Sequence, residues 1–158
     1  MIQVSTEPLT RANFAPFGDV IEAKGPPSKL INQGLCGRYH DLAALDLRGG
    51  ALGVSLFDAE PRALPYPLEM VERHPLGPQC FLPLHQHPFL VVVTDTPGAH
   101  LRAFVTDGAQ GVNFHRGTWH GVLTPLAAPG LFAVVDRVEG EGNLQEHWFD
   151  APYEVVAS

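Results

Sequence analysis

The sequence is poor in positive charge, and this scarcity excludes two kinds of partner. Only 10 of its 158 residues are lysine or arginine, against 17 aspartates and glutamates, so the formal net charge is −7. A chain with this balance lacks the basic surface that binds nucleic acid or anionic lipid. It also has no apolar run of the ~18 residues needed to span a bilayer. We therefore expect no nucleic-acid partner and no membrane partner.

Cysteine is equally scarce, which excludes a disulfide framework. The two cysteines, Cys36 and Cys80, do not form a Cys-x-x-Cys pair. We expect both to be buried free thiols in a reducing compartment. The N-terminal residues 1–7 contain neither the basic nor the apolar region of a signal peptide. Together these features predict a cytoplasmic protein.

Turn-forming residues, in contrast, are abundant. The chain contains 16 glycines and 15 prolines, and 45% of its residues are hydrophobic. This composition favours many short strands joined by turns over a helical bundle. The length fits one domain, over residues 1–158, with a core of its own. The one helix expected covers residues 11–15, after Thr10 as N-cap.

The pattern predicts an all-β fold of roughly ten to twelve short strands, as in a β-sandwich or barrel. The run at 89–93 is continuously apolar and is therefore expected to be buried on both faces. The expected strands cover residues 20–22, 30–32, 38–42, 52–57, 68–74, 79–83, 89–93, 101–105, 111–115, 118–123, 131–136 and 144–149.

The segment from Glu72 to Gln79 concentrates polar chemistry at a predicted strand end. Glu72 and His74 are two residues apart, so a strand places both on one face, together with Leu68 and Met70. The turn residues at 75–78 then predict a hairpin to the next strand. A face that ends in carboxylate and imidazole beside a turn is typical of a barrel mouth.

Two further clusters could take part in chemistry. His115 and His120 flank an Arg116-Gly117 turn, and Asp136 and Arg137 end a strand that is expected to be buried. A charged pair at a strand end is usually a solvated rim.

A literal His-x-His occurs at His85-Gln86-His87, and on a strand both rings would share a face. No glutamate follows at the spacing of a metal motif. We interpret this pair as part of a surface loop.

The two main clusters resemble the motifs of the cupin superfamily. Cupins carry a first motif His-x-His-x3-4-Glu, which Glu72-x-His74-x4-Gln79 resembles, and a second motif that Arg116 to His120 resembles. The resemblance implies a cupin-like double-stranded β-helix, an antiparallel β-barrel with few short helices. It also implies a divalent metal held by Glu72, His74, Gln79 and His120. The neutral Gln79 in place of a carboxylate should weaken such a site, or leave it purely substrate-binding.

At closer range the chain resembles the ureidoglycolate lyase family. The resemblance extends from about residue 9 to about residue 137, and the segment after Gly140 matches weakly. It rests on segments 17–22, 38–42, 72–77, 101–104, 110–115, 119–120 and 136–137, which include Glu-Arg-His-Pro-Leu-Gly and Gly-Val-Asn-Phe-His.

The resemblance implies an enzyme, a carbon–nitrogen lyase that splits ureidoglycolate into glyoxylate and urea in allantoin and purine degradation. It also implies nickel as the metal and a homodimer. Elimination needs a base, an acid and an anchor for the substrate carboxylate. We assign catalytic roles to Glu72, His74, His115 and His120, and substrate binding to Arg38, Arg73, Gln79 and Arg137.

The roles within this set stay open at the level of sequence. His120 or Glu72 could be the base in the absence of metal, with His115 as acid, and a regular strand directs Arg73 away from Glu72 and His74. The alternatives are a ureidoglycolate hydrolase that releases ammonia and a non-catalytic cupin that binds a small acid. A metal-dependent isomerase or oxygenase ranks lowest, because the usual His-His-Glu set is incomplete.

Overall fold

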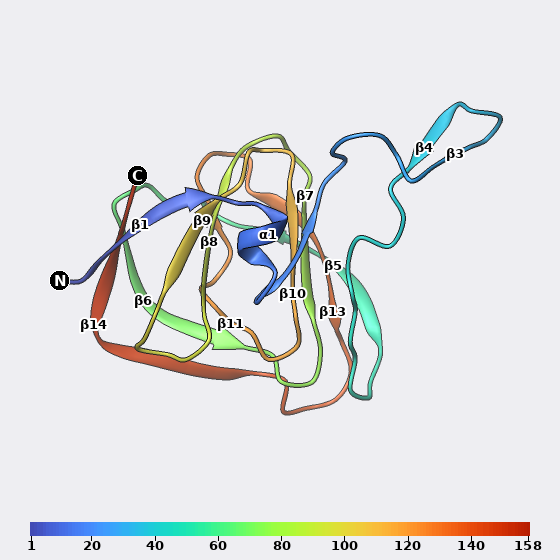
Figure 1. Ribbon diagram of the computed structural model, residues 1–158. Coiled ribbons are helices and arrows are strands. Elements are labelled where there is room, and N and C mark those ends of the chain that lie inside the picture. Colours follow the sequence, from blue (N-terminus) through green and yellow to red (C-terminus); the bar gives the residue numbers. More distant parts are fainter.

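The computed structural model describes residues 1–158 and confirms an all-β fold with one short helix (Figure 1). The closed barrel within it fits a cupin-like fold. The elements are β1 (Gln3–Pro8), α1 (Arg11–Phe14), β2 (Gly18–Ile21), β3 (Lys29–Ile31), β4 (Cys36–Arg38), β5 (Leu52–Asp58), β6 (Tyr66–Arg73), β7 (Gln79–Pro83), β8 (Phe89–Thr94), β9 (Arg102–Val105), β10 (Gly111–Phe114), β11 (Trp119–His120), β12 (Thr124–Pro125), β13 (Leu131–Arg137) and β14 (Gln145–Val156).

Seven strands form the first sheet, in the order β11-β6-β14-β1-β9-β8-β12. An additional β11–β8 pairing closes six of these strands into a barrel. All of its pairings are antiparallel except those of β1, which runs parallel to both β14 and β9. The expectation of an antiparallel barrel is therefore wrong for β1 and holds for its other strands. The sequence analysis missed β1 because its residues 3–8 mix polar and apolar side chains without a clear apolar face.

The second sheet has five antiparallel strands in the order β2-β10-β7-β13-β5. Two apolar clusters fill the molecule, and β8 contributes to both of them. Phe89, Val91 and Val93 belong to the cluster that β8 shares with β7, β10 and β13 of the second sheet. Leu90 and Val92 belong to the cluster inside the closed barrel. All six residues of β8 are buried, which confirms the prediction from the apolar run.

The hairpin predicted from β6 and β7 is wrong. The two strands belong to different sheets and do not pair with each other. Each strand pairs with other strands instead. β6 pairs with β14 from Tyr66 to Arg73, and β7 lies between β10 and β13. The turn at 74–78 thus carries the chain from one sheet to the other.

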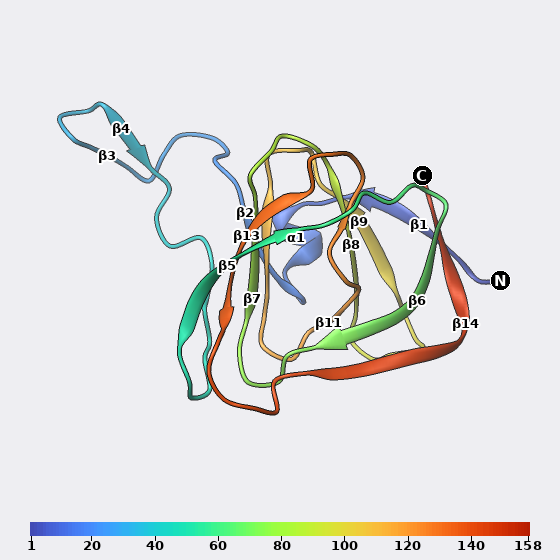
Figure 2. The same ribbon diagram turned by 180° about the vertical axis from the view of Figure 1, so that it is seen from behind.

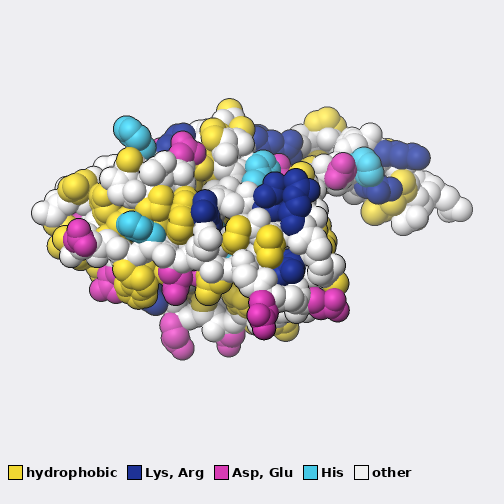
Figure 3. All heavy atoms as spheres, turned by 90° about the horizontal axis from the view of Figure 1, so that it is seen from below, with side chains coloured by type: hydrophobic (Ala, Val, Ile, Leu, Met, Phe, Trp, Pro, Cys, Tyr) yellow, Lys and Arg dark blue, Asp and Glu magenta, His cyan; other side chains and the backbone are white.

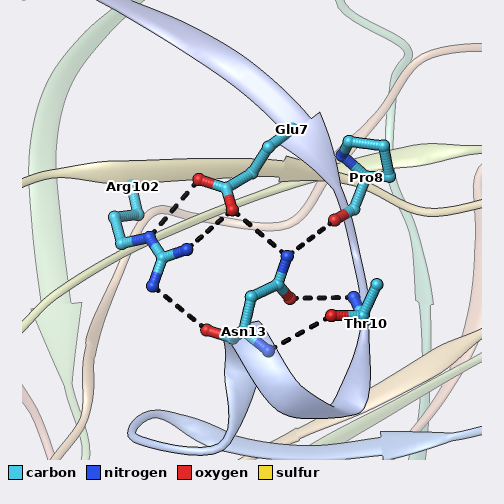
Figure 4. A network of polar contacts seen from close by, with 5 residues as sticks. All are labelled: Glu7, Pro8, Thr10, Asn13 and Arg102. Atoms are coloured by element: carbon cyan, nitrogen blue, oxygen red, sulfur yellow. Dashed lines mark hydrogen bonds and ion pairs between the residues drawn. The ribbon is translucent and has the colours of Figure 1, made fainter.

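The helix α1 begins where the sequence places it and is tied to two strands. The side chains of Thr10 and Asn13 exchange hydrogen bonds with each other's backbone N–H groups, which is a capping box. Asn13 also donates to the Glu7 carboxylate and to the carbonyl of Pro8 (Figure 4). Arg102 of β9 binds Glu7 at 2.6 Å and donates to the carbonyl of Asn13.

No helix of this chain has both the length and the apolar character needed to cross a bilayer.

One segment projects from the rest of the molecule. The hairpin β3–β4 extends beyond the side formed by β5 and β13 (Figures 1 and 2). The expected strand at 38–42 is wrong, since β4 ends at Arg38 and residues 39–47 form no strand. Cys36 lies on this hairpin and is exposed, so only Cys80 is the buried free thiol that the sequence predicts. The chain ends in β14, which continues to Val156 and is longer than expected.

Candidate active site

The site is built on the face of the barrel that looks toward the second sheet. Glu72 of β6 and His120 of β11 are partners in the ladder, and His120 also pairs with Val93 of β8. Val93 packs between the sheets, and the ring of His120 stacks on Phe114 of β10 at 4.1 Å. Gln79 begins β7 on the opposite sheet. The two sheets therefore bring Glu72, His120 and Gln79 together.

Glu72 lies outside the apolar cluster that Leu68 joins. Leu68 and Val71 both belong to the cluster inside the closed barrel, although they are three residues apart. Glu72 pairs with His120, which also pairs with Val93 of the cluster between the sheets. The ladder between β6 and β14 is irregular in this region, with the extra residues on β14 between Trp148 and Tyr153. The expectation that Glu72 shares a face with Leu68 is therefore wrong.

Glu72, His74 and His120 form the one cluster of acidic and imidazole groups with metal-ligand geometry. One ligand atom from each lies within 4.8 Å of the others. His74 Nε2 and Glu72 Oε1 are 4.0 Å apart, and the rings of His74 and His120 have centroids 5.3 Å apart.

His120 is fully buried and holds an unused lone pair. Its Nδ1 donates to the carbonyl oxygen of Gly121 at 2.8 Å, which fixes the neutral tautomer with the lone pair on Nε2. That Nε2 atom is buried and has no hydrogen-bond partner. Burial lowers the pKa of His120 to about 3, the Gly121 carbonyl opposes this, and nearby His74 lowers it further. His120 therefore presents a neutral nitrogen acceptor throughout the physiological pH range.

His74 is held from both sides. Its Nδ1 donates to the carbonyl of Asn143 at 2.8 Å, and its Nε2 lies 3.0 Å from Gln79 Oε1. The amide of Gln79 in turn donates to Asp136 at 3.2 Å. The chain Asp136–Gln79–His74 thus orients the imidazole toward Glu72.

Glu72 has an elevated affinity for protons. Burial raises its pKa, the neighbouring His74 lowers it, and Glu146 raises it again. Since burial is the largest of these effects, the pKa of this carboxyl stands above its ordinary value. A carboxyl group of this kind can both take up and release a proton nearer to neutrality.

A cavity of about 460 Å³ is lined by Glu72, the one member of this cluster that borders it. This volume is in the range of small-molecule sites. A larger cavity of about 940 Å³ lies elsewhere, among residues of β1, the loop after β2 and the loop after β9, and its lining contains no histidine or cysteine. The smaller cavity is lined by Phe57, Asp58, Ala59, Glu72, Gln79, Phe81, Val122 and Leu123.

The same cluster suits a divalent cation. The Nδ1 atoms of His74 and His120 are each bound to a backbone carbonyl, as occurs behind metal-binding histidines. Their Nε2 atoms and the Glu72 carboxylate form a two-histidine, one-carboxylate set, in which His74 Nε2 would exchange its contact with Gln79 Oε1 for the cation. Gln79 was expected as a fourth ligand, but its amide is engaged by His74 and Asp136.

His115 lies outside this group. Its Nε2 is 3.2 Å from Asp19, on the outer side of the second sheet, because Phe114 before it points inward to His120. Burial raises the pKa of Asp19, but hydrogen bonds from Ala44 and Asn113 and the neighbouring His115 outweigh it, so the pKa is lowered. The contacts of His115 therefore hold the segment around Ala44 against the sheet.

None of the three candidate arginines reaches the cavity. Arg73 stacks over Trp119 at 4.6 Å and binds Gln145, so it lies on the face opposite Glu72, as a regular strand end predicts. Arg137 donates to the carbonyl of Gly49. Arg38 is exposed on the projecting hairpin.

The His85–His87 pair also stands apart. The two rings stack with centroids 5.6 Å apart, and His85 packs on Phe132 at 4.8 Å. The pair lies in the loop after β7, as expected, but it is half-buried and not fully exposed. Burial lowers the pKa of His85, and nearby His87 lowers it further.

Two contributors were missed by sequence reasoning. Asp136 was interpreted as a solvated rim, whereas it accepts from Gln79. Asn143 holds His74 through its carbonyl and binds the backbone of Leu76 through its side chain. An asparagine within the glycine-rich loop 140–144 was the one available signal, and it does not specify a partner.

Comparison with known proteins identifies the family of this chain. The family model described as ureidoglycolate lyase matches residues 1–156. A protein of Rhodobacter capsulatus named ureidoglycolate lyase is 56% identical over 156 residues, which cover 96% of this chain and 97% of that one. Ureidoglycolate lyase 2 of Rhizobium meliloti is 48% identical, with 98% of both chains covered. The ureidoglycolate lyase of a Chelativorans species is 50% identical, with 98% and 97% covered. The chain belongs to the ureidoglycolate lyase family.

Proposed function

We propose that this protein eliminates urea from ureidoglycolate to give glyoxylate in allantoin and purine degradation, at the cluster of Glu72, His74 and His120. One observation carries the assignment of the site. The buried Nε2 of His120 has no partner within the chain, although the ligand atoms of His120, His74 and Glu72 lie within 4.8 Å of one another and Glu72 lines a cavity. A buried polar atom without a partner is rare and calls for a ligand.

The elimination requires one proton to move between two atoms on the same carbon. The substrate carries its hydroxyl and its ureido nitrogen on one carbon, next to a carboxylate. Removal of the hydroxyl proton forms the C=O bond, the C–N bond breaks, and the nitrogen takes up a proton as urea leaves. A single carboxyl group can therefore accept the proton from oxygen and return it to nitrogen.

Glu72 is the group we assign to this transfer. Its raised pKa strengthens it as a base, and His74, whose Nε2 lies 4.0 Å away, opposes the effect of burial on that pKa. His120 accepts the hydrogen bond of the substrate hydroxyl through Nε2 and so orients that proton. With a pKa of about 3 it is too weak a base to remove the proton itself. Gln79 fixes His74 and borders the cavity.

The residues that would hold a divalent cation are Glu72, His74 and His120, and the cation would supply Lewis acidity to the substrate hydroxyl. We propose nickel, because two imidazole nitrogens and one carboxylate suit a borderline metal. Chelator treatment followed by added Ni²⁺, Mn²⁺ or Mg²⁺ tests this. Recovery by Ni²⁺ above the others is expected, and full activity after chelation would contradict a metal requirement.

Two further proposals accompany the reaction. The chain is taken as one functional domain, because β8 contributes to both apolar clusters. A cytoplasmic location agrees with the exposed free thiol of Cys36, which a reducing compartment preserves.

The test is product analysis with purified protein. We expect glyoxylate and urea in equal amounts without ammonia, and a Glu72→Gln variant that loses at least about 100-fold in kcat/KM. His87→Gln is the matched control, since His87 lies outside the cluster, and its activity should be unchanged. Ammonia in place of urea would indicate the hydrolase. No turnover with or without divalent metal would leave only a small-acid-binding cupin.

A further inference from the structure

The cavity lacks a group that its substrate needs. The only charged side chains of its lining are those of Asp58 and Glu72, both acidic. Arg73 and Arg137 are engaged elsewhere. The proposed cation would serve the substrate hydroxyl, and a carboxylate is bound in two hydrogen bonds by an arginine, which this lining does not contain. The site of a single chain is therefore incomplete, an argument that rests on the proposed function.

The missing cation is found on the projecting hairpin. We call residues 23–40 the arm. It contains Lys24, Lys29 and Arg38 and no acidic residue. The chain's two lysines thus both lie on the arm. With a charge of −7 for the chain and +3 for the arm, the remainder carries −10. Figure 3 shows cationic side chains along the projecting arm.

The arm is braced internally but covers little of its own chain. Tyr39 donates its hydroxyl to the carbonyl of Gly25 at 2.6 Å, and Ser28 accepts from the backbone of His40. Apart from Pro27 and Ile31, every residue from Ala23 to Arg38 is exposed. Leu30 and Leu35 are among them, and Leu35 is 87% exposed. A preformed element that presents leucines to solvent is suited to dock on another surface.

A surface of matching character lies on β5. This strand pairs with β13 alone and leaves its other edge free. Val54 and Leu56 project outward from it and are 73% and 64% exposed, while Phe57 points inward to Phe81. Asp58 ends the strand and borders the cavity. An apolar edge strand of this kind is normally covered.

The two surfaces lie on the same side of the molecule, because the arm leaves the body beside β5 in both views (Figures 1 and 2). The arm does not cover β5 of its own chain, since Leu30 and Leu35 of the arm and Val54 and Leu56 of β5 are all exposed. A second copy can supply the matching surface, since a two-fold axis makes each copy give one arm and receive one. The opposite charges of arm and body favour this pairing over a neutral partner.

We propose that the arm docks on β5 of a second copy of this chain and brings Arg38 to the mouth of that copy's cavity. Leu30 and Leu35 pack against Val54 and Leu56 in this dimer. The guanidinium of Arg38 passes Asp58 and binds the substrate carboxylate in two hydrogen bonds. Each active site is then completed by the other subunit.

The docking is tested by sedimentation equilibrium, which needs no activity. The full chain is expected to be a dimer, and Leu35→Asp and Val54→Asp should each weaken dimerisation at least about 100-fold. Ile2→Asp is the matched control. Ile2 is 65% exposed and lies at the end opposite the arm in Figure 1, so this variant should remain a dimer. A monomeric full chain, or dimers that resist both substitutions, would overturn the proposal.

The role of Arg38 is tested by complementation. Arg38→Gln should remain a dimer and lose about 10–100-fold in kcat/KM, and Glu72→Gln should be inactive. Co-expression of the two gives mixed dimers in which one site has both native groups. About a quarter of the wild-type activity should return if pairing is random. No recovery would show that Arg38 does not act across the interface.

These results separate the two proposals. If the wild-type protein shows no turnover, the proposed function fails, whereas the sedimentation result still decides whether the arm docks. If turnover is present and the protein is monomeric, the function stands and the arm proposal fails.

Discussion

His120→Gln should remove a specific part of the pH dependence of stability. The buried ring has a pKa of about 3, against an ordinary value of 6.5. Between these two values the unfolded chain binds a proton that the folded chain does not bind. The stabilisation is therefore complete above pH 6.5 and is lost as the pH falls toward 3.

The magnitude follows from the size of the shift. One proton difference changes the free energy of unfolding by about 1.4 kcal/mol per pH unit. Between pH 6.5 and pH 4.5 the wild-type protein should thus lose about 2 kcal/mol through His120 alone, since the unfolded ring is only half protonated at pH 6.5. Glu72 contributes a slope of opposite sign, because its pKa is raised in the folded state, but it does so in both proteins.

The measurement is urea unfolding of wild-type and His120→Gln protein, treated with chelator, at half-unit steps from pH 6.5 to 4.5. The difference between their unfolding free energies should change with pH by about 1.4 kcal/mol per unit. Repeating the comparison in a Glu72→Gln background removes the opposing slope as a control. Parallel pH profiles would refute the view that His120 is held neutral by burial.

Three other substitutions test separate parts of the structure. Gln79→Ala cuts the link between Asp136 and His74 and should lower kcat/KM about 10–100-fold with an unchanged circular dichroism spectrum; wild-type kinetics would count against the link. His115→Gln should keep activity within about threefold, because its ring pairs with an acid outside the cavity, and a larger loss in steady-state assays would return it to the catalytic set. Asn13→Ala should lower the free energy of unfolding by about 1–2 kcal/mol in urea titrations and leave kcat/KM unchanged, since it removes one half of the capping box and the hydrogen bonds to Glu7 and Pro8, all of them away from Glu72, His74 and His120.

Local sequence determined much of the strand content. The continuous apolar run of β8, the Thr10 cap and the turn residues around 75–78 each act over a few neighbours, so their effect can be read without a partner. The same holds for Arg73, whose position beside Glu72 on a strand predicts that the two side chains point apart. The motif spacing likewise brought Glu72, His74 and His120 into one candidate set, and the family resemblance gave the reaction.

The tertiary structure alone decided which sheet each strand joins and which face each side chain meets. Pairing between β6 and β14 joins residues more than seventy positions apart and is irregular between Trp148 and Tyr153 of β14. Leu68 and Val71 share one cluster although they are three residues apart, so strict alternation in the sequence could not locate Glu72 correctly. The burial that lowers the pKa of His120 comes from both sheets together, and the links through Asn143 and Asp136 cross between distant segments. The sequence by itself thus determined the chemical groups, and long-range strand pairing decided their positions and their protonation.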